Sequence, residues 1–132
     1  MADKKTWEYD GATLFLDMDD VNTIERYENA FAAMQERFGE QEETASTAGK
    51  LRVYCEAIRF LFDTIFGAGT ADALLGEGLH IGKCEEAYDS FLAFVQAQTA
   101  ERTERHAQMV RKYTPNRAQR RTAEKSAKAD KA

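Results

Sequence analysis

Two stretches of the chain carry large apolar residues at spacings of three and four, the pattern that places side chains on one face of an α-helix. The first stretch contains Val21, Ile24, Tyr27, Phe31, Met34 and Phe38. The second, from Leu51 to Phe66, is the most apolar part of the chain. The sequence therefore predicts a helical protein whose core is centred on the second stretch.

The residues around these stretches indicate where the helices begin and end. Asp17, Asp19 and Asp20 place acceptors and negative charge before a helix that starts near Val21, and Gly39 ends it. After a polar connector, Ser46 or Thr47 is expected to cap the second helix, which ends at Gly67-Ala68-Gly69. Thr70 is expected to be the N-cap of a short helix from Ala71 to Leu75.

The last predicted helix is long, and only its first part has an apolar face. Cys84, Tyr88, Phe91, Leu92 and Val95 continue an apolar face, but the pattern fades beyond Gln98. Pro115 is expected to end this helix, because the residue before a proline is pushed out of helical geometry. After Asn116 there is no apolar residue larger than alanine, so we expect a tail that is disordered when free.

The N-terminal part is predicted to be extended, because the turn dipeptide Asp10-Gly11 lies between two short runs of strand-forming residues. We therefore predict an all-α fold of three main helices plus one short helix, preceded by a short hairpin or arm. The predicted organisation is an arm over residues 1–19, a helical domain over 20–113 and a flexible basic tail over 114–132.

The charge of the chain is unevenly distributed. Residues 1–110 hold 10 Lys and Arg against 21 Asp and Glu, a net charge of −11, whereas residues 111–132 hold 8 against 2, a net charge of +6. An acidic body repels a phosphate backbone, so a nucleic-acid partner is not expected except through the tail. The opposite charges also predict self-association, with the tail of one copy on the body of the next.

Neither a membrane span nor a secretory signal is predicted. The apolar stretch from Ala57 to Phe66 is broken by Arg59 and Asp63 and is shorter than the roughly 20 residues that cross a bilayer. The first residues are charged and lead into Trp7 without an apolar segment. We therefore expect a protein of a reducing cytoplasm.

The sequence offers few residues for catalysis or metal binding. Its two histidines, His80 and His106, lie in no motif with a nucleophile, and zinc normally requires four ligands. Cys55 and Cys84 are predicted to be small buried residues of the core. No catalytic residue, metal site or cofactor is predicted, and the chain is not expected to be an enzyme.

The basic tail is the first candidate binding segment. Asn116, Arg117, Arg120 and Arg121 could pair with an acidic or phosphate-bearing partner, because the planar guanidinium group suits bidentate hydrogen bonding. The alternative is that the tail only improves solubility. Composition does not decide between them.

Several segments together resemble the small tail assembly chaperones of long-tailed phages and prophages of Gram-positive bacteria. The resemblance covers about Trp7 to Arg121. It is carried by the segments 25–30, 55–57, 62–70, 87–91 and 113–121, of which the Pro-Asn-Arg-Ala-Gln-Arg-Arg stretch beginning at Pro115 is the most specific.

The resemblance implies a non-enzymatic assembly factor made in the cytoplasm of the infected host and absent from the mature virion. Such chaperones bind the long helical tape measure protein, keep it soluble and leave as the tail tube polymerises around it. The alternative function is a regulatory module that binds nucleic acid or protein through the basic tail.

A chaperone for an apolar helical client needs apolar surface, and fourteen aromatic residues are more than a small core obviously requires. Phe62, Phe66, Phe91 and Phe94 are the candidates for lining a groove that binds a client helix. The alternative is that all four belong to the core.

Overall fold

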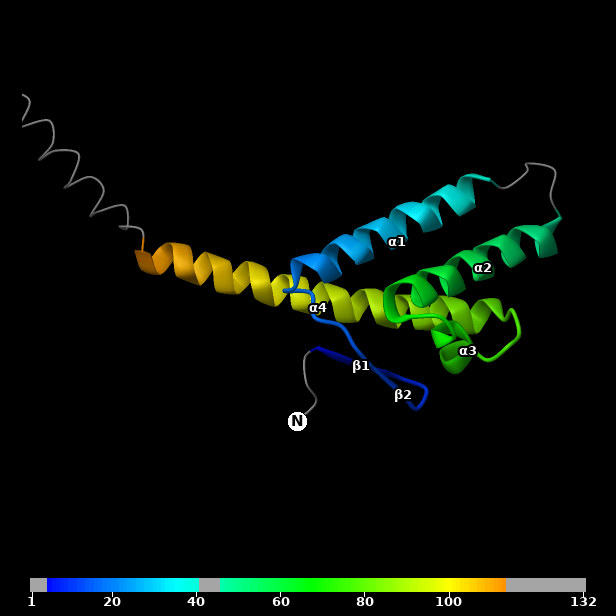
Figure 1. Cartoon of the computed structure of the whole chain (residues 1–132), viewed down its shortest axis with the longest axis horizontal. Coiled ribbons are helices and arrows are strands. Elements are labelled where there is room, and N and C mark those ends of the chain that lie inside the picture. Colours follow the sequence, from blue (N-terminus) through cyan, green and yellow to red (C-terminus); the bar gives the residue numbers. More distant parts are fainter. Residues whose placement is uncertain (1–4, 41–45, 114–132) are drawn as a thin grey trace, which may run out of the picture. The chain divides into compact units, whose positions relative to one another are not determined.

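The computed structural model describes residues 5–40 and 46–113 (Figure 1). In these ranges the chain forms two strands and four helices, in the order β1 (Thr6–Tyr9), β2 (Ala12–Phe15), α1 (Val21–Gly39), α2 (Thr47–Phe66), α3 (Thr70–Leu75) and α4 (Ile81–Tyr113). The predicted mostly helical class is confirmed, with three long helices, one short helix and an N-terminal hairpin. The predicted basic tail, with Asn116, Arg117, Arg120 and Arg121, lies outside the described residues.

The chain divides into two compact units, and the boundary falls inside α4, between Gln98 and Thr99. The first unit contains the hairpin, α1, α2, α3 and the N-terminal part of α4. The described part of the second unit is the helical segment 99–113, on which Met109, Val110 and Tyr113 are exposed. The apolar pattern in the sequence fades at the same place. The predicted three-part division at residues 19 and 113 stays a prediction.

The N-terminal strands form the hairpin that the sequence predicted. β1 and β2 pair antiparallel, with Trp7 opposite Leu14 and Tyr9 opposite Ala12. Asp10 and Gly11 both have positive φ angles, of 46° and 83°, as the tight turn of a two-residue hairpin loop requires. Trp7 is the one strand residue that is fully buried.

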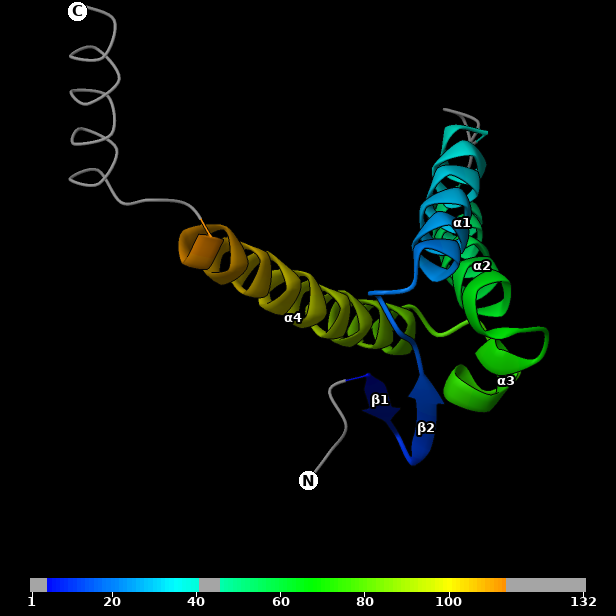
Figure 2. The same cartoon turned by 60° about the vertical axis from the view of Figure 1, so that its left-hand side comes forward.

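Helices α1 and α2 lie side by side, which Figures 1 and 2 both show. Asp20 caps α1 as expected, since its Oδ1 accepts hydrogen bonds from the amides of Asn22 and Thr23 at 2.9 and 3.4 Å. Ala30 and Met34 are buried on the inner face of α1. Met34 is one of the residues that the apolar spacing placed there, whereas Val21, from the same spacing, is 68% exposed.

Helix α2 is the centre of the core. Ser46 is its N-cap, with Oγ accepting from the Gly49 amide at 3.1 Å, and Gly67 ends it at a φ of 119°. The helix contributes six buried residues to the core, namely Cys55, Ala57, Ile58, Leu61, Phe62 and Ile65. The sequence-based prediction of the core centre is therefore confirmed. None of the helices in the described ranges is both long and apolar enough to cross a membrane.

The expected cap of α3 is wrong by one residue and in its chemistry. Gly69, in the left-handed region, precedes the helix, and Thr70 is already its first residue. The Thr70 hydroxyl donates backward to the Gly67 carbonyl at 2.7 Å. The carboxylate of Asp63, in α2, accepts from the Ala71 amide at 2.8 Å and so takes the capping role from a neighbouring helix. A tertiary contact has replaced the local one.

Candidate functional site

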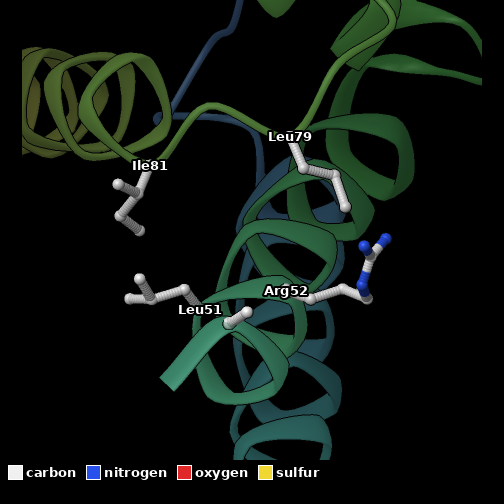
Figure 3. Close-up of a pocket in the computed structure, with 5 residues that line it drawn as sticks. Leu51, Arg52, Leu79 and Ile81 are labelled. Carbon is white, nitrogen blue, oxygen red and sulfur yellow. The ribbon is translucent and has the colours of Figure 1, made fainter. Parts of the chain in front are cut away.

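An apolar groove lies between the first turns of α2 and α4. It consists of two adjoining hollows that share Leu51 and Ile81. One, of about 250 Å³, is lined by Ala48, Leu51, Arg52, Leu79 and Ile81, and the other, of about 300 Å³, by Lys50, Leu51, Tyr54, Ile81 and Glu85. We call these residues the α2–α4 groove. Figure 3 shows the side chains of α2 facing Ile81 and Leu79 across the first hollow.

The floor of the groove is apolar and open to solvent. Leu51 is 41% exposed and Leu79 is 37% exposed, whereas Ile81 is half-buried and packs against the core. Single exposed aliphatic side chains are ordinary on a protein surface, but Leu51 and Leu79 line a hollow that an apolar side chain of a partner could fill. Their positions are fixed by local structure: Leu51 lies in the first turns of the capped helix α2, and Leu79 and Ile81 flank the start of α4.

The rim of the groove carries charge of both signs. Lys50 and Arg52 come from α2 and Glu85 from α4. Burial raises the pKa of the Tyr54 hydroxyl above its ordinary value of 10.0, and the carboxylate of Glu85 raises it further. Tyr54 is therefore a neutral hydroxyl at physiological pH, and its ring stacks on Phe38 with the ring centroids 5.3 Å apart. The site can bind an apolar side chain and pair with flanking charges, but it offers no nucleophile with a neighbouring base.

The aromatic residues predicted to line a groove lie elsewhere. Phe62 and Phe91 are fully buried, so in this structure they belong to the core and not to an open surface. Phe66 and Phe94 are half-buried and pack against that core. Trp7 of the hairpin contacts both Phe62 and Phe91, and Tyr27 of α1 also contacts Phe91. That these four phenylalanines bind a client stays a prediction.

Trp7 packs against three of these four phenylalanines. Its ring centroid lies 5.6 Å from that of Phe62, 6.1 Å from that of Phe66 and 5.3 Å from that of Phe91. Its indole N–H donates to Ser90 Oγ at 2.9 Å. The structure thus brings together three of the four predicted phenylalanines, with Trp7 over them.

The two cysteines are buried as free thiols. Burial raises the pKa of Cys84 to about 12, with a hydrogen bond to Cys55 as the next cause. A thiol with such a pKa is almost entirely protonated at neutral pH and is a poor nucleophile. Within residues 5–40 and 46–113, no group of three or more His, Cys, Asp or Glu side chains is placed to hold a metal ion.

Sequence reasoning proposed none of the groove residues as a binding site. Leu79 lies in the irregular segment before α4, and Ile81 is the first residue of that helix, so no periodicity marks either residue as buried or exposed. The apolar spacing places Leu51 on the inner face of its helix. Leu51 lies near the N-terminus of α2, however, where that face no longer contacts the core, and it is therefore exposed. The glycines around residues 76–82 showed that a loop passes there, but no sequence signal showed which helix the loop faces.

The chain was compared with known families and proteins. Residues 10–124 match the model of a family described as a family of unknown function, DUF6673. No curated protein and no solved structure matches the chain.

Proposed function

We propose that this chain, which belongs to the DUF6673 family, is a non-enzymatic phage tail assembly chaperone that binds and solubilises the tape measure protein. The single observation that carries the proposal is the α2–α4 groove, a hollow surface lined by the exposed side chains of Leu51 and Leu79. The resemblance of the sequence to tail assembly chaperones supplies the identity of the client.

The groove suits one side of an amphipathic helix. A client helix that presents apolar residues at i, i+3 or i+4 would insert one into each of the two adjoining hollows, over Leu51 and Ile81. Lys50 and Arg52 at the rim favour acidic residues beside the client's apolar stripe. Such binding covers apolar surface on both partners, which is the physical basis of keeping a long helical protein in solution.

The chaperone acts in the host cytoplasm and leaves before the virion is complete, as the resemblance implies. Self-association into oligomers belongs to the same proposal, since a long client offers many equivalent helical turns to successive copies. The alternative function, binding of nucleic acid or protein through the basic tail, depends on residues 114–132. These lie outside the described ranges, and no described contact favours it.

The proposal is tested by co-expression with the tape measure protein of the same genome. Leu51→Asp places a carboxylate on the floor of the groove, and Val21→Asp is the matched control, because Val21 is an apolar helical residue that is 68% exposed and lies outside the groove. We expect the wild-type chain and Val21→Asp to keep the tape measure protein soluble. Leu51→Asp is expected to weaken binding at least tenfold, since about 1.4 kcal/mol suffices for that factor.

Circular dichroism on each purified variant shows whether it remains helical. A tape measure protein that stays insoluble with the wild-type chain would overturn the proposed function. Equal recovery with Leu51→Asp and with the wild-type chain would instead remove the groove as the binding surface.

A further inference from the structure

One wall of the α2–α4 groove is formed by a loop. Residues 76–80 connect α3 to α4, and Leu79 of this loop lines the first hollow together with Leu51 of α2 (Figure 3). Leu79 is 37% exposed, so burial in the core does not fix its position. The loop also contains Gly76 and Gly78, and glycine leaves the backbone more freedom than any other residue does. The shape of the hollow therefore depends on the contacts that hold this loop.

On the N-terminal side of Leu79, the loop is held by Arg59 of α2. The Nη1 atom of Arg59 donates a hydrogen bond to the Gly78 carbonyl at 3.3 Å. Its Nη2 atom forms an ion pair with the carboxylate of Asp72 in α3. The Arg59 side chain is 13% exposed, so the guanidinium group lies against the protein and not in solvent. Arg59 thus joins α2 to α3 and to the residue directly before Leu79.

On the C-terminal side of Leu79, the backbone is held by His80. Its Nδ1 accepts a hydrogen bond from the Lys83 amide at 3.1 Å, and its carbonyl accepts from the Cys84 amide at 3.0 Å. His80 therefore caps α4 with its side chain. A Cβ atom at Gly82 would lie 3.0 Å from the imidazole Cε1, so the lack of a side chain there makes room for the ring. Leu79 is an exposed leucine between two anchored neighbours.

The two anchors have different effects on the groove. His80 orients the loop relative to α4, whereas Arg59 belongs to α2, the helix that carries Leu51. Burial raises the pKa of the Cys84 thiol and the positive charge of Arg59 acts against this rise, which shows that the guanidinium group also lies near α4. Arg59 is therefore the side chain that relates the loop to both helices of the groove. A surface that is ordered before its partner arrives loses less conformational entropy on binding.

We propose that Arg59 is a positioning residue of the α2–α4 groove, which holds Leu79 beside Leu51 through its hydrogen bond to the Gly78 carbonyl. Arg59 does not line either hollow, so it acts through Leu79. The effect on a client rests on the proposed function. The anchoring of Leu79 does not.

Three variants separate the anchor from the charge. Arg59→Lys keeps the positive charge, but an ammonium group lacks the planar fork by which arginine binds two groups in fixed positions. Asp72→Asn removes the charge of the ion pair and keeps an oxygen that accepts from Arg59, so the hydrogen bond to Gly78 should remain. Arg26→Lys is the matched control, because Arg26 is an exposed arginine of α1 outside the groove.

The anchoring is measured without a client, by the NMR order parameter of the Leu79 backbone amide. A value of about 0.85 describes a rigid backbone and a value below about 0.6 a flexible one. We expect a rigid Leu79 in the wild-type chain, in Asp72→Asn and in Arg26→Lys, and a flexible one in Arg59→Lys. The melting temperature of Arg59→Lys should fall by less than about 8 °C, because the carboxylate that it pairs with is 63% exposed.

A flexible Leu79 in the wild-type chain would overturn the proposal, and this measurement needs no variant to fold. An order parameter that Arg59→Lys leaves unchanged would overturn it too. So would an equal decrease in Asp72→Asn, because the ion pair and not the bond to Gly78 would then hold the loop.

The consequence for binding is measured by competition. The wild-type chain and one variant, with different affinity tags, are co-expressed with the tape measure protein of the same genome, and the ratio in which they co-purify with it is determined. Arg59→Lys should be recovered about fivefold less than the wild-type chain, the factor expected when one side chain must be ordered on binding. Arg26→Lys should be recovered equally. Equal recovery of Arg59→Lys would show that the client does not need the anchored loop, which contradicts the proposal.

The failure of this proposal can be distinguished from the failure of the proposed function. If the tape measure protein stays insoluble with the wild-type chain, the proposed function is wrong, and the order parameters still decide whether Arg59 anchors the groove wall. If the tape measure protein is solubilised while Leu79 is equally ordered in Arg59→Lys, the proposed function stands and the positioning role of Arg59 is wrong.

Discussion

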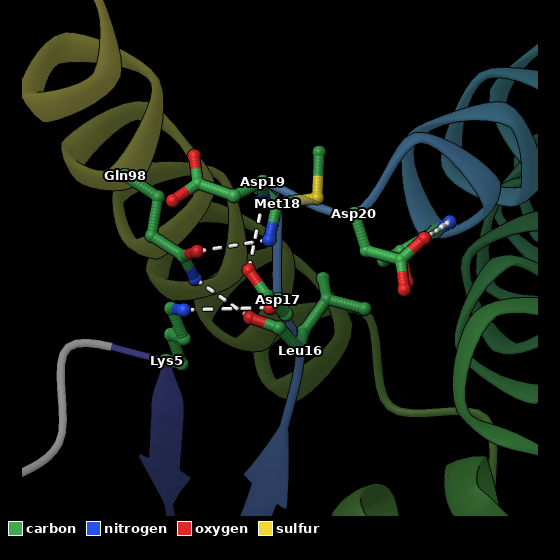
Figure 4. A network of polar contacts seen from close by, with 8 residues as sticks. Lys5, Leu16, Asp17, Met18, Asp19, Asp20 and Gln98 are labelled. Atoms are coloured by element: carbon green, nitrogen blue, oxygen red, sulfur yellow. Dashed lines mark hydrogen bonds and ion pairs between the residues drawn. The ribbon is translucent and has the colours of Figure 1, made fainter.

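Gln98 is a buried polar side chain of α4 that binds the segment between the hairpin and α1, and its replacement tests how much this contact stabilises the fold. It is 8% exposed; its side-chain N–H donates to the Leu16 carbonyl at 2.8 Å, and its Oε1 accepts from the Met18 amide at 3.0 Å (Figure 4). Gln98→Ala removes both hydrogen bonds at once. Removing the side chain that pairs with a buried polar group costs about 1–3 kcal/mol, so for two such bonds we expect a loss of about 3 kcal/mol in the free energy of unfolding.

Thermal unfolding followed by circular dichroism measures this loss. For a unit of about a hundred residues, each kcal/mol lowers the melting temperature by about 4–8 °C, so the expected decrease is about 12–24 °C. Gln96→Ala is the matched control, because Gln96 is the same residue type two positions away on the same helix and is exposed. It is expected to change stability by less than about 0.5 kcal/mol. If the two variants unfold within about 0.5 kcal/mol of each other, the two Gln98 hydrogen bonds do not stabilise the fold and the reasoning is refuted.

Three further predictions concern the core and the first turn of α2. The Cys84 thiol, with a pKa of about 12, should react with iodoacetamide at pH 8 only after unfolding, as mass spectrometry of the native and urea-unfolded chain would show. The folded-state pKa of Cys84 lies above the ordinary 9.0, so as the pH rises the thiol loses its proton in the unfolded chain before it does in the folded one. The contribution of Cys84 to the free energy of unfolding, measured by urea titration, should therefore be about 1.4 kcal/mol smaller at pH 10 than at pH 7. Unchanged stability up to pH 10 would contradict its burial. Ser46→Ala should cost about 1 kcal/mol in the same titration, whereas Thr47→Ala, just after the cap, should cost clearly less.

Much of the helical fold could be predicted because its signals are local. The acceptor at Asp20 and the hydroxyl at Ser46 mark helix starts, and the apolar spacing along α2 identifies the residues that form the core centre. The Asp10-Gly11 turn likewise identifies the hairpin, since both residues must take positive φ angles. In each case the deciding interaction joins residues within four positions of one another.

The features that were not predicted depend on contacts between distant residues. Gln98 is about 80 positions from the two backbone groups that it binds, and its polarity gave no sign of burial. Trp7 was recognised as a residue that should pack on a helix, but which aromatic side chains it would cover depends on how the hairpin folds back. The same holds for the α2–α4 groove, because Leu79 and Ile81 line one hollow with Leu51 only once α3 and its loop are in place.

The measurement that tests the central claim most directly is photo-crosslinking of the chain to its client. A photoreactive p-benzoylphenylalanine is placed at Leu51 in one version of the chain and at Val21 in another, and each is irradiated with the co-expressed tape measure protein. Binding in the α2–α4 groove predicts strong crosslinks from position 51 and few from position 21, although Val21 is the more exposed of the two. Crosslinks that are equal at both positions, or absent from position 51, would contradict the claim that this groove binds the client.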